Sequence, residues 1–355
     1  MASISELTTD AIELLKELIA TPSFSSEEDQ TAGLIAKWFA LHHIPTERRQ
    51  NNIIAKNKHF DPQKPSILLN SHHDTVKPNT AYTKNPFLPQ VEADKLYGLG
   101  SNDAGGCLVS LMAVFAHFYA SEDLRYNLIL VASAEEESSG PNGLNSVLPH
   151  LPPFDFAIVG EPTQMQLAIA EKGLLVLDCF AHGQAGHAAH GLGENSIYKA
   201  VEAIEWFRTF EFPKISETLG KIRMTVTQID AGNQHNVIPA SCHFVVDVRV
   251  TDAYTNQEVL EIVQQSLDIE VKARSLRLNA SSIPKDHPIV LAGIQMGRET
   301  YGSPTLSDQA ALSCHSLKLG PGDSHRSHSA DEFIYLYEIE EGILLYTKLL
   351  ETVIF

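Results

Sequence analysis

The sequence lacks apolar runs of membrane-spanning length, and its amino terminus lacks a basic segment followed by an apolar one. A helix that crosses a bilayer needs about 20 largely apolar residues, and a secretory signal needs that order of basic and apolar residues. We therefore expect a cytoplasmic protein without a membrane partner.

Cysteine is scarce as well. The four cysteines, at positions 107, 179, 242 and 314, are scattered and show no spacing typical of metal or redox motifs. A disulfide framework and a cysteine-based metal site are thereby excluded, and we expect thiols in a reducing compartment.

Basic residues are outnumbered, because 26 Lys and Arg face 44 Asp and Glu, which gives a formal net charge of −18. This balance argues against nucleic acid or an anionic membrane surface as a partner. What the chain does have is length and apolar content. Its 355 residues, 43% of them hydrophobic, are sufficient for two domains with cores of their own.

A buried strand is predicted where the sequence reads ILLNSHHDTV, at residues 67–76. In α/β sheets, the carboxyl ends of such strands form the binding sites. Because side chains two apart point the same way, His72 and Asp74 lie side by side, so that one ring nitrogen can bind metal while Asp74 orients the ring. A lone His-x-Asp is more often an ordinary strand-end histidine, so other ligands must be found.

Further carboxylates follow other predicted elements. Asp103 lies in a glycine-rich turn before a helical pattern, where it is either a ligand or an ordinary helix cap. The strand predicted at 127–134 is followed by Glu135, Glu136 and Glu137. Three adjacent carboxylates repel one another, which favours a solvated face or a nearby cation.

Two more segments supply similar groups. The strand predicted at 154–160 ends in Glu161, and the glycine-rich segment at 320–332 contains His325 and His328. Together these motifs resemble the dizinc aminoacylase and carboxypeptidase family, which includes acetylornithine deacetylase, succinyl-diaminopimelate desuccinylase and several dipeptidases. The resemblance extends from residue 72 to residue 332, with five motifs in the family's order, and is nearest to the first two enzymes.

The resemblance implies a ligand set for two Zn²⁺ ions: Asp103 bridges them, His72 and Glu161 hold one, and Glu137 and His328 hold the other. Nitrogen and oxygen ligands of this kind suit zinc and also admit Co²⁺ or Mn²⁺. The family further implies a cis peptide bond between Asp103 and Ala104.

The resemblance also assigns catalytic roles. Glu136 is the general base, Asp74 orients His72, and His187, in a glycine and histidine motif, stabilises the developing oxyanion from its own or a partner subunit. The alignment of the acidic triplet leaves a second possibility, in which Glu135 is the base and Glu136 a ligand.

We expect an α/β fold with a mostly parallel, helix-flanked sheet of the zinc exopeptidase type at residues 1–172 and 282–355. Strands and helices alternate up to Glu161, which is the pattern of a parallel sheet. From residue 173 the predicted order is β-α-β-β-α-β, typical of a ferredoxin-like unit. The resemblance implies that residues 173–281 are an inserted α+β lid that also forms a homodimer contact.

Substrate recognition rests on weaker signals. The resemblance implies that Asn236, in an Asn-Val-Ile-Pro motif, contacts substrate. Arg249 either pairs with a substrate carboxylate or is an ordinary surface arginine. The family often has lysine where this chain has Gly105, and the consequence of that change is open.

The implied activity is metal-dependent hydrolysis that removes an Nα-acetyl or Nα-succinyl group from an amino acid such as ornithine or citrulline, as in arginine biosynthesis. Two alternatives stay open: a dipeptidase or carboxypeptidase with the same chemistry, and a non-catalytic binding protein that keeps the fold.

Overall fold

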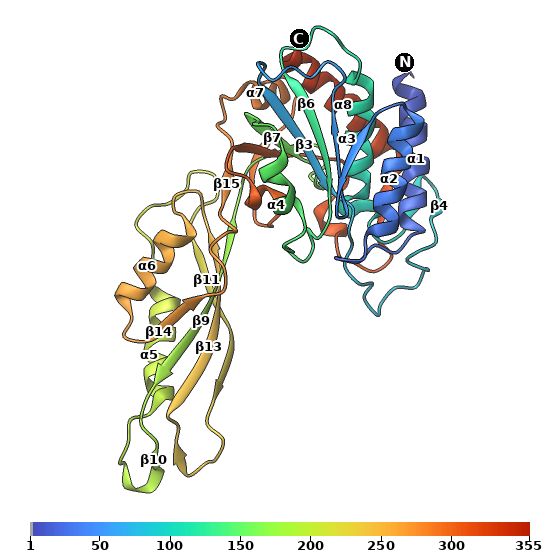
Figure 1. Ribbon diagram of the computed structural model, residues 1–355. Coiled ribbons are helices and arrows are strands. Elements are labelled where there is room, and N and C mark those ends of the chain that lie inside the picture. Colours follow the sequence, from blue (N-terminus) through green and yellow to red (C-terminus); the bar gives the residue numbers. More distant parts are fainter. Residues whose placement is uncertain (1–2) are drawn as a thin grey trace. The chain divides into compact units, whose positions relative to one another are not determined.

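The computed structural model describes residues 3–355 and divides the chain into two compact units (Figure 1). Unit 1 comprises the chain up to Ile169 together with Ser282–Tyr301 and Ser307–Phe355, and unit 2 comprises Ala170–Ser281 and Gly302–Leu306. The short segment Gly302–Leu306 thus groups with unit 2, although the predicted boundaries place it in the first domain.

Unit 1 is built on a nine-stranded sheet with the order β1-β2-β6-β3-β7-β17-β8-β15, in which β16 also pairs with β8. The four central strands β6, β3, β7 and β17 are mutually parallel, whereas the pairs β1–β2, β2–β6 and β8–β17 are antiparallel. The strands are β1 (Thr46–Arg49), β2 (Asn52–Lys56), β3 (Ser66–His72), β6 (Asn127–Ser133), β7 (Phe156–Val159), β8 (Leu167–Glu171), β15 (Ser281–Ser282), β16 (Thr300–Ser303) and β17 (His315–Lys318). The predicted mostly parallel sheet is confirmed.

The central strands are buried on both faces, and their side chains alternate between two cores. In β3, Ile67 and Leu69 join the larger core and Leu68 the smaller one, and in β6 Leu128 and Leu130 alternate with Ile129 and Val131 in the same way. Because successive side chains of a strand point to opposite faces, continuous apolar runs of this kind require helices on both sides of the sheet.

Helices supply both coverings. The larger core also contains residues of α1 (Ile4–Ile19), α2 (Asp29–Leu41), α3 (Gly106–Phe118), α7 (Pro288–Gln295) and α8 (Leu336–Ile354), whereas the smaller core contains Leu144 and Val147 of α4 (Leu144–Val147). Figure 1 shows α1, α2, α3 and α8 grouped beside β3 and β6. Short helical turns are η1 (Ser101–Gly105), η2 (Leu148–His150), η4 (Asp308–Ala311) and η5 (Ser324–Arg326), and a small antiparallel sheet contains β4 (Gln90–Glu92), β5 (Lys95–Tyr97) and β18 (Phe333–Tyr335).

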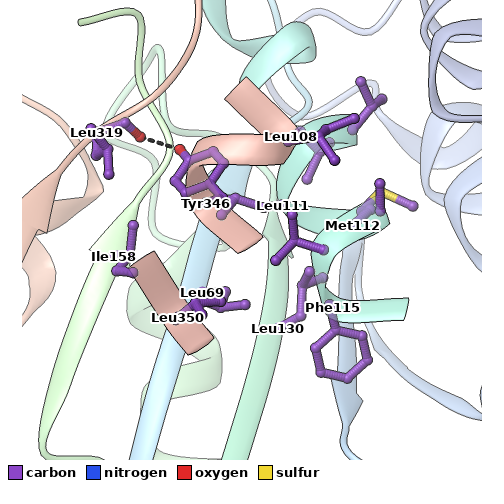
Figure 2. Close-up of a cluster of buried hydrophobic side chains, with 14 of the residues drawn as sticks. Leu69, Leu108, Leu111, Met112, Phe115, Leu130, Ile158, Leu319, Tyr346 and Leu350 are labelled. Carbon is purple, nitrogen blue, oxygen red and sulfur yellow. Dashed lines mark hydrogen bonds between the residues drawn. The ribbon is translucent and has the colours of Figure 1, made fainter. Parts of the chain in front are cut away.

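The centre of the larger core lies between α3, α8 and the sheet (Figure 2). Tyr346 of α8 is fully buried there, and its hydroxyl donates a hydrogen bond to the carbonyl oxygen of Leu319, just after β17. A buried phenol is stable only with such a partner. The contact fixes α8 against the segment that leads into the glycine-rich loop at 320–332.

Unit 2 has the predicted ferredoxin-like order. Its elements are β9 (Gly173–His182), α5 (Ser196–Thr209), β11 (Arg223–Ala231), β13 (Ser241–Val250), α6 (Asn256–Ser266) and β14 (Glu270–Ala273), with the sheet order β11-β13-β9-β14 and all pairs antiparallel. Alternate residues of β9 pack with α5 and α6 in a core of their own. A two-stranded sheet of β10 (Gly186–His187) and β12 (Val237–Ile238), and the turn η3 (Ala188–His190), complete the unit.

Some boundaries differ from the predicted ones. Apolar periodicity predicts the first helix at residues 10–20, with Thr9 or Asp10 as its cap, but α1 begins at Ile4, where Ser3 and Glu6 form a capping box. The sequence pattern also predicts a helix near 288–300, whereas α7 ends at Gln295 because Gly297, with φ of 78°, terminates it. Among the helices of residues 3–355, none is both long and apolar enough to cross a bilayer.

Candidate metal and catalytic site

The strand β3 places its terminal side chains on opposite sides. His72 Nδ1 lies 3.0 Å from the carbonyl oxygen of Asp74 and 3.4 Å from Asp74 Oδ1. His73 points the other way, where its ring nitrogens lie 2.9 Å from Thr31 Oγ1 and 2.9 Å from the carbonyl oxygen of Asn51. Burial lowers the pKa of His73 to about 4, so this histidine is neutral and structural.

The other nitrogen of His72 faces carboxylates. Nε2 lies 3.3 Å from Asp103 Oδ1, 3.7 Å from Glu161 Oε1 and 3.8 Å from Glu136 Oε2. Because a carbonyl oxygen only accepts, the contact with Asp74 assigns the proton of the neutral ring to Nδ1. Nε2 is buried and has no well-formed hydrogen bond within the described chain, so a metal ion that displaces its proton would meet no competing partner.

Asp103 is held at the start of α3 by its backbone. It lies in η1, and the peptide bond between Asp103 and Ala104 is cis, which confirms that prediction. The buried carboxylate of Glu332 accepts hydrogen bonds from the backbone N–H groups of Gly100, Asn102 and Asp103 at 3.2, 2.9 and 2.9 Å. Burial, followed by the charge of Asp103, raises the pKa of Glu332 to about 8.

Asp74 positions the acidic triplet after β6. Its Oδ1 accepts a hydrogen bond from the backbone N–H of Glu136 at 3.0 Å. Its Oδ2 accepts one from the backbone N–H of Glu137 at 3.1 Å and one from the hydroxyl of Ser25 at 2.6 Å. One carboxylate thus ties the end of β3 to the turn after β6. Besides its predicted contact with His72, Asp74 therefore has a second role that its spacing did not reveal.

The three glutamates of the triplet separate in space. Glu135, with φ of 54°, turns away from His72, and its carboxylate accepts hydrogen bonds from Ser26 Oγ at 2.9 Å and from the backbone and side-chain nitrogens of Asn142 at 2.9 and 3.0 Å. Glu136 and Glu137 instead face the histidines. The geometry favours the assignment of these two as the functional pair over the shifted alternative.

His328 joins the site from the glycine-rich loop. Its Nε2 lies 3.0 Å from Glu137 Oε2 and 3.6 Å from Asp103 Oδ2. The hydrogen bond to Glu137, with the charge of Asp103, raises the pKa of His328 to about 9. A histidine ligand must be neutral, so a metal ion here would displace this proton.

The charges of the site are strongly coupled. Burial raises the pKa of Glu136, and the carboxylates of Glu161, Asp308 and Glu137 raise it further against the opposing effect of His72. Although burial alone lowers the pKa of His72, the charge of Glu136 and the other carboxylates raises it well above its usual value. The motifs did not identify Asp308, whose Oδ2 accepts the hydroxyl of Ser133 at 2.5 Å. Burial raises the pKa of Asp308 to about 6.

These residues fit a metal ion. Two overlapping groups have ligand atoms within 4.8 Å of one another: His72 with Asp103 and Glu137, and His72 with Glu136 and Glu161. Nitrogen and carboxylate donors around an unpartnered, buried Nε2 suit a divalent cation. The grouping differs from the predicted division of the ligands between two ions, because Glu136 lies as close to His72 as Glu161 does.

The remaining predicted residues lie in unit 2. His187 pairs with Val237 across β10 and β12, next to Asn236, whose carbonyl oxygen accepts the N–H of Ala188 at 3.0 Å. Arg249 lies near the far end of β13, and its Nε donates to Asp247 Oδ1 at 2.9 Å. Within the unit, His187 and Asn236 are neighbours, whereas Arg249 is apart from them and is already paired.

Comparisons with known proteins identify the family of the chain. Residues 68–352 match peptidase family M20/M25/M40. The acetylornithine deacetylase of Proteus mirabilis (strain HI4320) is 29% identical over 377 aligned positions, covering 96% of each protein. A probable carboxypeptidase of Aspergillus niger is 26% identical over 369 positions, covering 96% of this chain and 88% of that one.

The solved structures agree as well. The YXEP protein of Bacillus subtilis, described as a dinuclear metal binding peptidase from the M20 family, has a TM-score of 0.73 at 14% identity and 98% coverage of both chains. With a family match that spans most of the sequence, this chain belongs to peptidase family M20/M25/M40 and is a metallohydrolase.

Proposed function

We propose that this protein is a metal-dependent amide hydrolase that removes an Nα-acetyl or Nα-succinyl group from an amino acid such as ornithine or citrulline. The observation that carries the hydrolase chemistry is the position of Glu136, a carboxylate of raised pKa beside the cluster of His72, Asp103 and Glu161. The near full-length similarity to an acetylornithine deacetylase supports the substrate class.

Five residues of unit 1 would serve as metal ligands. His72, Asp103, Glu137, Glu161 and His328 would hold two divalent ions, which we expect to be Zn²⁺ with Co²⁺ or Mn²⁺ as substitutes. When bound, such ions supply Lewis-acid activation of water and of the amide carbonyl.

Glu136 would act as the general base. It removes a proton from the attacking water and delivers a proton to the leaving amine as the amide C–N bond breaks, so that the products are a carboxylic acid and a free amino acid. Burial and the neighbouring carboxylates raise the pKa of Glu136, which makes it a stronger base than an exposed glutamate. Asp74 holds the backbone of Glu136 in place.

Unit 2 would contribute His187 as an oxyanion donor, Asn236 as a substrate contact and Arg249 as a partner for the substrate carboxylate. For Arg249 this requires exchange of its present partner Asp247. We also propose a cytoplasmic homodimer that assembles through unit 2 and acts in arginine biosynthesis. Sedimentation of the purified protein tests the dimer directly.

A second activity is favoured by one specific observation. The similarity to a probable carboxypeptidase extends over 96% of this chain at 26% identity, close to the value for the deacetylase. A dipeptide or carboxy-terminal residue would use the same water, base and leaving amine. The two activities differ only in the acyl group that the site accepts.

The test is hydrolysis of a panel by zinc-loaded protein: acetylornithine, acetylcitrulline, succinylornithine, succinyl-diaminopimelate and dipeptides. Release of ornithine or citrulline supports the deacylase, and release from dipeptides alone supports the alternative. If the metal-loaded protein hydrolyses none of them, the proposed substrate class is wrong.

Three variants identify the base. Glu136→Gln should bind zinc yet lose activity by a factor of about 10² to 10⁴. Glu135→Gln should retain activity, because its carboxylate is bonded to Ser26 and Asn142. The exposed Glu340→Gln is the control for a change of charge. Loss of turnover in Glu135→Gln with full activity in Glu136→Gln would reverse the assignment.

A further inference from the structure

A cavity with a volume of about 270 Å³ lies beside α8 in unit 1. Its walls include Arg298, which follows α7, and Met165, which follows the Glu161 segment. From α8 come Glu338, Glu341 and Leu345. This volume is near the lower limit for small-molecule sites, which are commonly about 300–1,000 Å³. None of the residues assigned to the metal site lines it.

Of the residues that line the cavity, Arg298 alone is cationic. Its backbone N–H closes the end of α7 by donating to the carbonyl oxygen of Gly293 at 3.0 Å, but its side-chain Nε is buried and has no hydrogen-bond partner in residues 3–355. Guanidinium groups only donate, and a carboxylate accepts two of their N–H groups side by side. A carboxylate inside the cavity would pair with the guanidinium group of Arg298, which lines it.

The α8 wall has the opposite charge. Glu341 is exposed, and Glu338 lines the cavity while accepting hydrogen bonds from Arg326 Nη1 at 2.9 Å and Nη2 at 2.6 Å. Met165, which is 6% exposed, and Leu345 add apolar surface between the charges. A cation, a pair of carboxylates and an apolar wall match a small molecule that has both a carboxylate and an ammonium group.

We propose that this cavity binds a free α-amino acid as its zwitterion, with the carboxylate on Arg298 and the ammonium group at Glu341 and Glu338. Its identification with the amino acid released by the enzyme rests on the proposed function. The cavity would then be a site at which the product regulates its own formation.

The contact between Glu338 and Arg326 links this cavity to the metal site. Arg326 lies two residues before His328, and its guanidinium is fixed by Glu338 and by the carbonyl oxygen of Phe333. An ammonium group at Glu338 competes with Arg326 for the same carboxylate. Binding therefore loosens the loop that presents His328, and the product acts as a non-competitive inhibitor.

Calorimetric titration of the zinc-loaded, full-length protein tests the binding. The probes are L-ornithine and L-citrulline, with putrescine as the analogue that lacks the carboxylate. We expect Arg298→Gln to weaken one binding event by about tenfold or more, because a charge-assisted pair is lost. Glu341→Gln should weaken the same event, and putrescine should not produce it. Glu340→Gln, one position along α8 and outside the cavity, should bind like wild type.

The exposed Glu341→Gln keeps the test decisive if Arg298→Gln folds poorly. Equal dissociation constants for both amino acids in wild type and Glu341→Gln, or binding of putrescine as tight as that of ornithine, would overturn the proposal. In kinetics, each variant is compared with its own rate without added product. Non-competitive inhibition in wild type and Glu340→Gln, but not in Arg298→Gln, supports the regulatory role.

The two proposals fail separately. Binding that depends on Arg298 without turnover of any panel substrate would support the amino acid site and contradict the proposed activity. Turnover with product inhibition that is purely competitive, and unchanged in Arg298→Gln and Glu341→Gln, would support the activity and overturn the regulatory site.

Discussion

Adjacent glutamates of one triplet have different surroundings in this protein, and the difference lies in tertiary contacts. The carboxylate of Glu135 accepts hydrogen bonds from Ser26 and Asn142, which are 109 and 7 residues away in sequence, whereas that of Glu136 faces His72. The motifs identified the residues that converge on His72 because metal ligands need particular residue types. They could not distinguish the register of the triplet, because the backbone turn at Glu135 decides it.

Glu332 belongs to the glycine-rich segment at 320–332, but its contacts could not be predicted from that motif. Its carboxylate accepts hydrogen bonds from three backbone N–H groups of the loop around Asp103. Such a role depends on where the loop folds and not on residue spacing. Asp308 is comparable, because its effect on Glu136 arises only when η4 packs near the end of β6.

Glu332 leads to a prediction about stability. Glu332→Ala leaves three backbone N–H groups without an acceptor, each costing about 1 kcal/mol or more, so we expect the free energy of unfolding to fall by about 3 kcal/mol. With a pKa of about 8 in the metal-free protein, Glu332 is largely protonated at pH 7. Glu332→Gln, a close mimic of that neutral acid, should therefore cost much less.

Urea unfolding of the metal-free variants at pH 7 measures the difference. The comparison with glutamine controls for loss of volume, since alanine also leaves a void. Equal midpoints for Glu332→Gln and Glu332→Ala would show that the negative charge, and not the hydrogen-bond geometry, holds the loop.

At the scale of elements, periodicity predicted the long and buried segments best. Apolar patterning predicts a strand at 173–182, which is β9 to the residue, and one at 127–134, which differs from β6 by one residue, because both segments are long and largely apolar. Short strands such as β17, with four residues, carry too few side chains for a period to be seen, although β17 is central to the sheet. The sequence pattern also predicts a strand at 269–278, of which only Glu270–Ala273 (β14) pairs with β9.

An ion cluster lies on the face of the unit 2 sheet that α5 and α6 do not cover. Asp178 of β9 accepts hydrogen bonds from Arg274 Nε at 2.8 Å and Nη2 at 3.0 Å, and its Oδ1 lies 2.9 Å from His243 Nε2 of β13. Arg274, followed by His243, lowers the pKa of Asp178 to about 2. The cluster connects β9, β13 and the residue after β14.

We expect Asp178→Asn to lower the free energy of unfolding by about 1 kcal/mol at pH 7, after allowance for solvent screening of this partly exposed group. Because the folded-state pKa lies below the unfolded value, the ionised carboxylate stabilises the protein above about pH 4. That stabilisation disappears as the pH falls towards 2, so the deficit of the variant should shrink over the same range. The exposed Asp252→Asn, in the turn after β13, is the control and should change stability by less than about 0.5 kcal/mol. A deficit that is constant from pH 7 to pH 2 would contradict the ionic origin.

At the scale of the whole molecule, the two units differ in what they contain. All the residues that form the candidate metal site belong to unit 1, whereas the ion cluster of Asp178 belongs to unit 2, and each unit has its own core. The chain has two tryptophans, Trp38 in α2 and Trp206 in α5, so each unit also has its own fluorescent reporter. Metal binding and unit stability can therefore be observed separately.

This division predicts the response to metal removal. A ligand that binds only the folded state stabilises it by about 4 kcal/mol at 1,000 times its dissociation constant, and 1 kcal/mol shifts the melting temperature by about 2–4 °C for domains of this size. In Trp206→Phe, where Trp38 is the sole reporter, we expect chelation to lower the melting temperature by about 8 °C or more. In Trp38→Phe, where Trp206 reports on unit 2, chelation should have little effect and Asp178→Asn should lower the transition instead. If chelation shifts both reporters equally, the units unfold as one cooperative structure, and the stability of unit 2 depends on a metal that it does not bind.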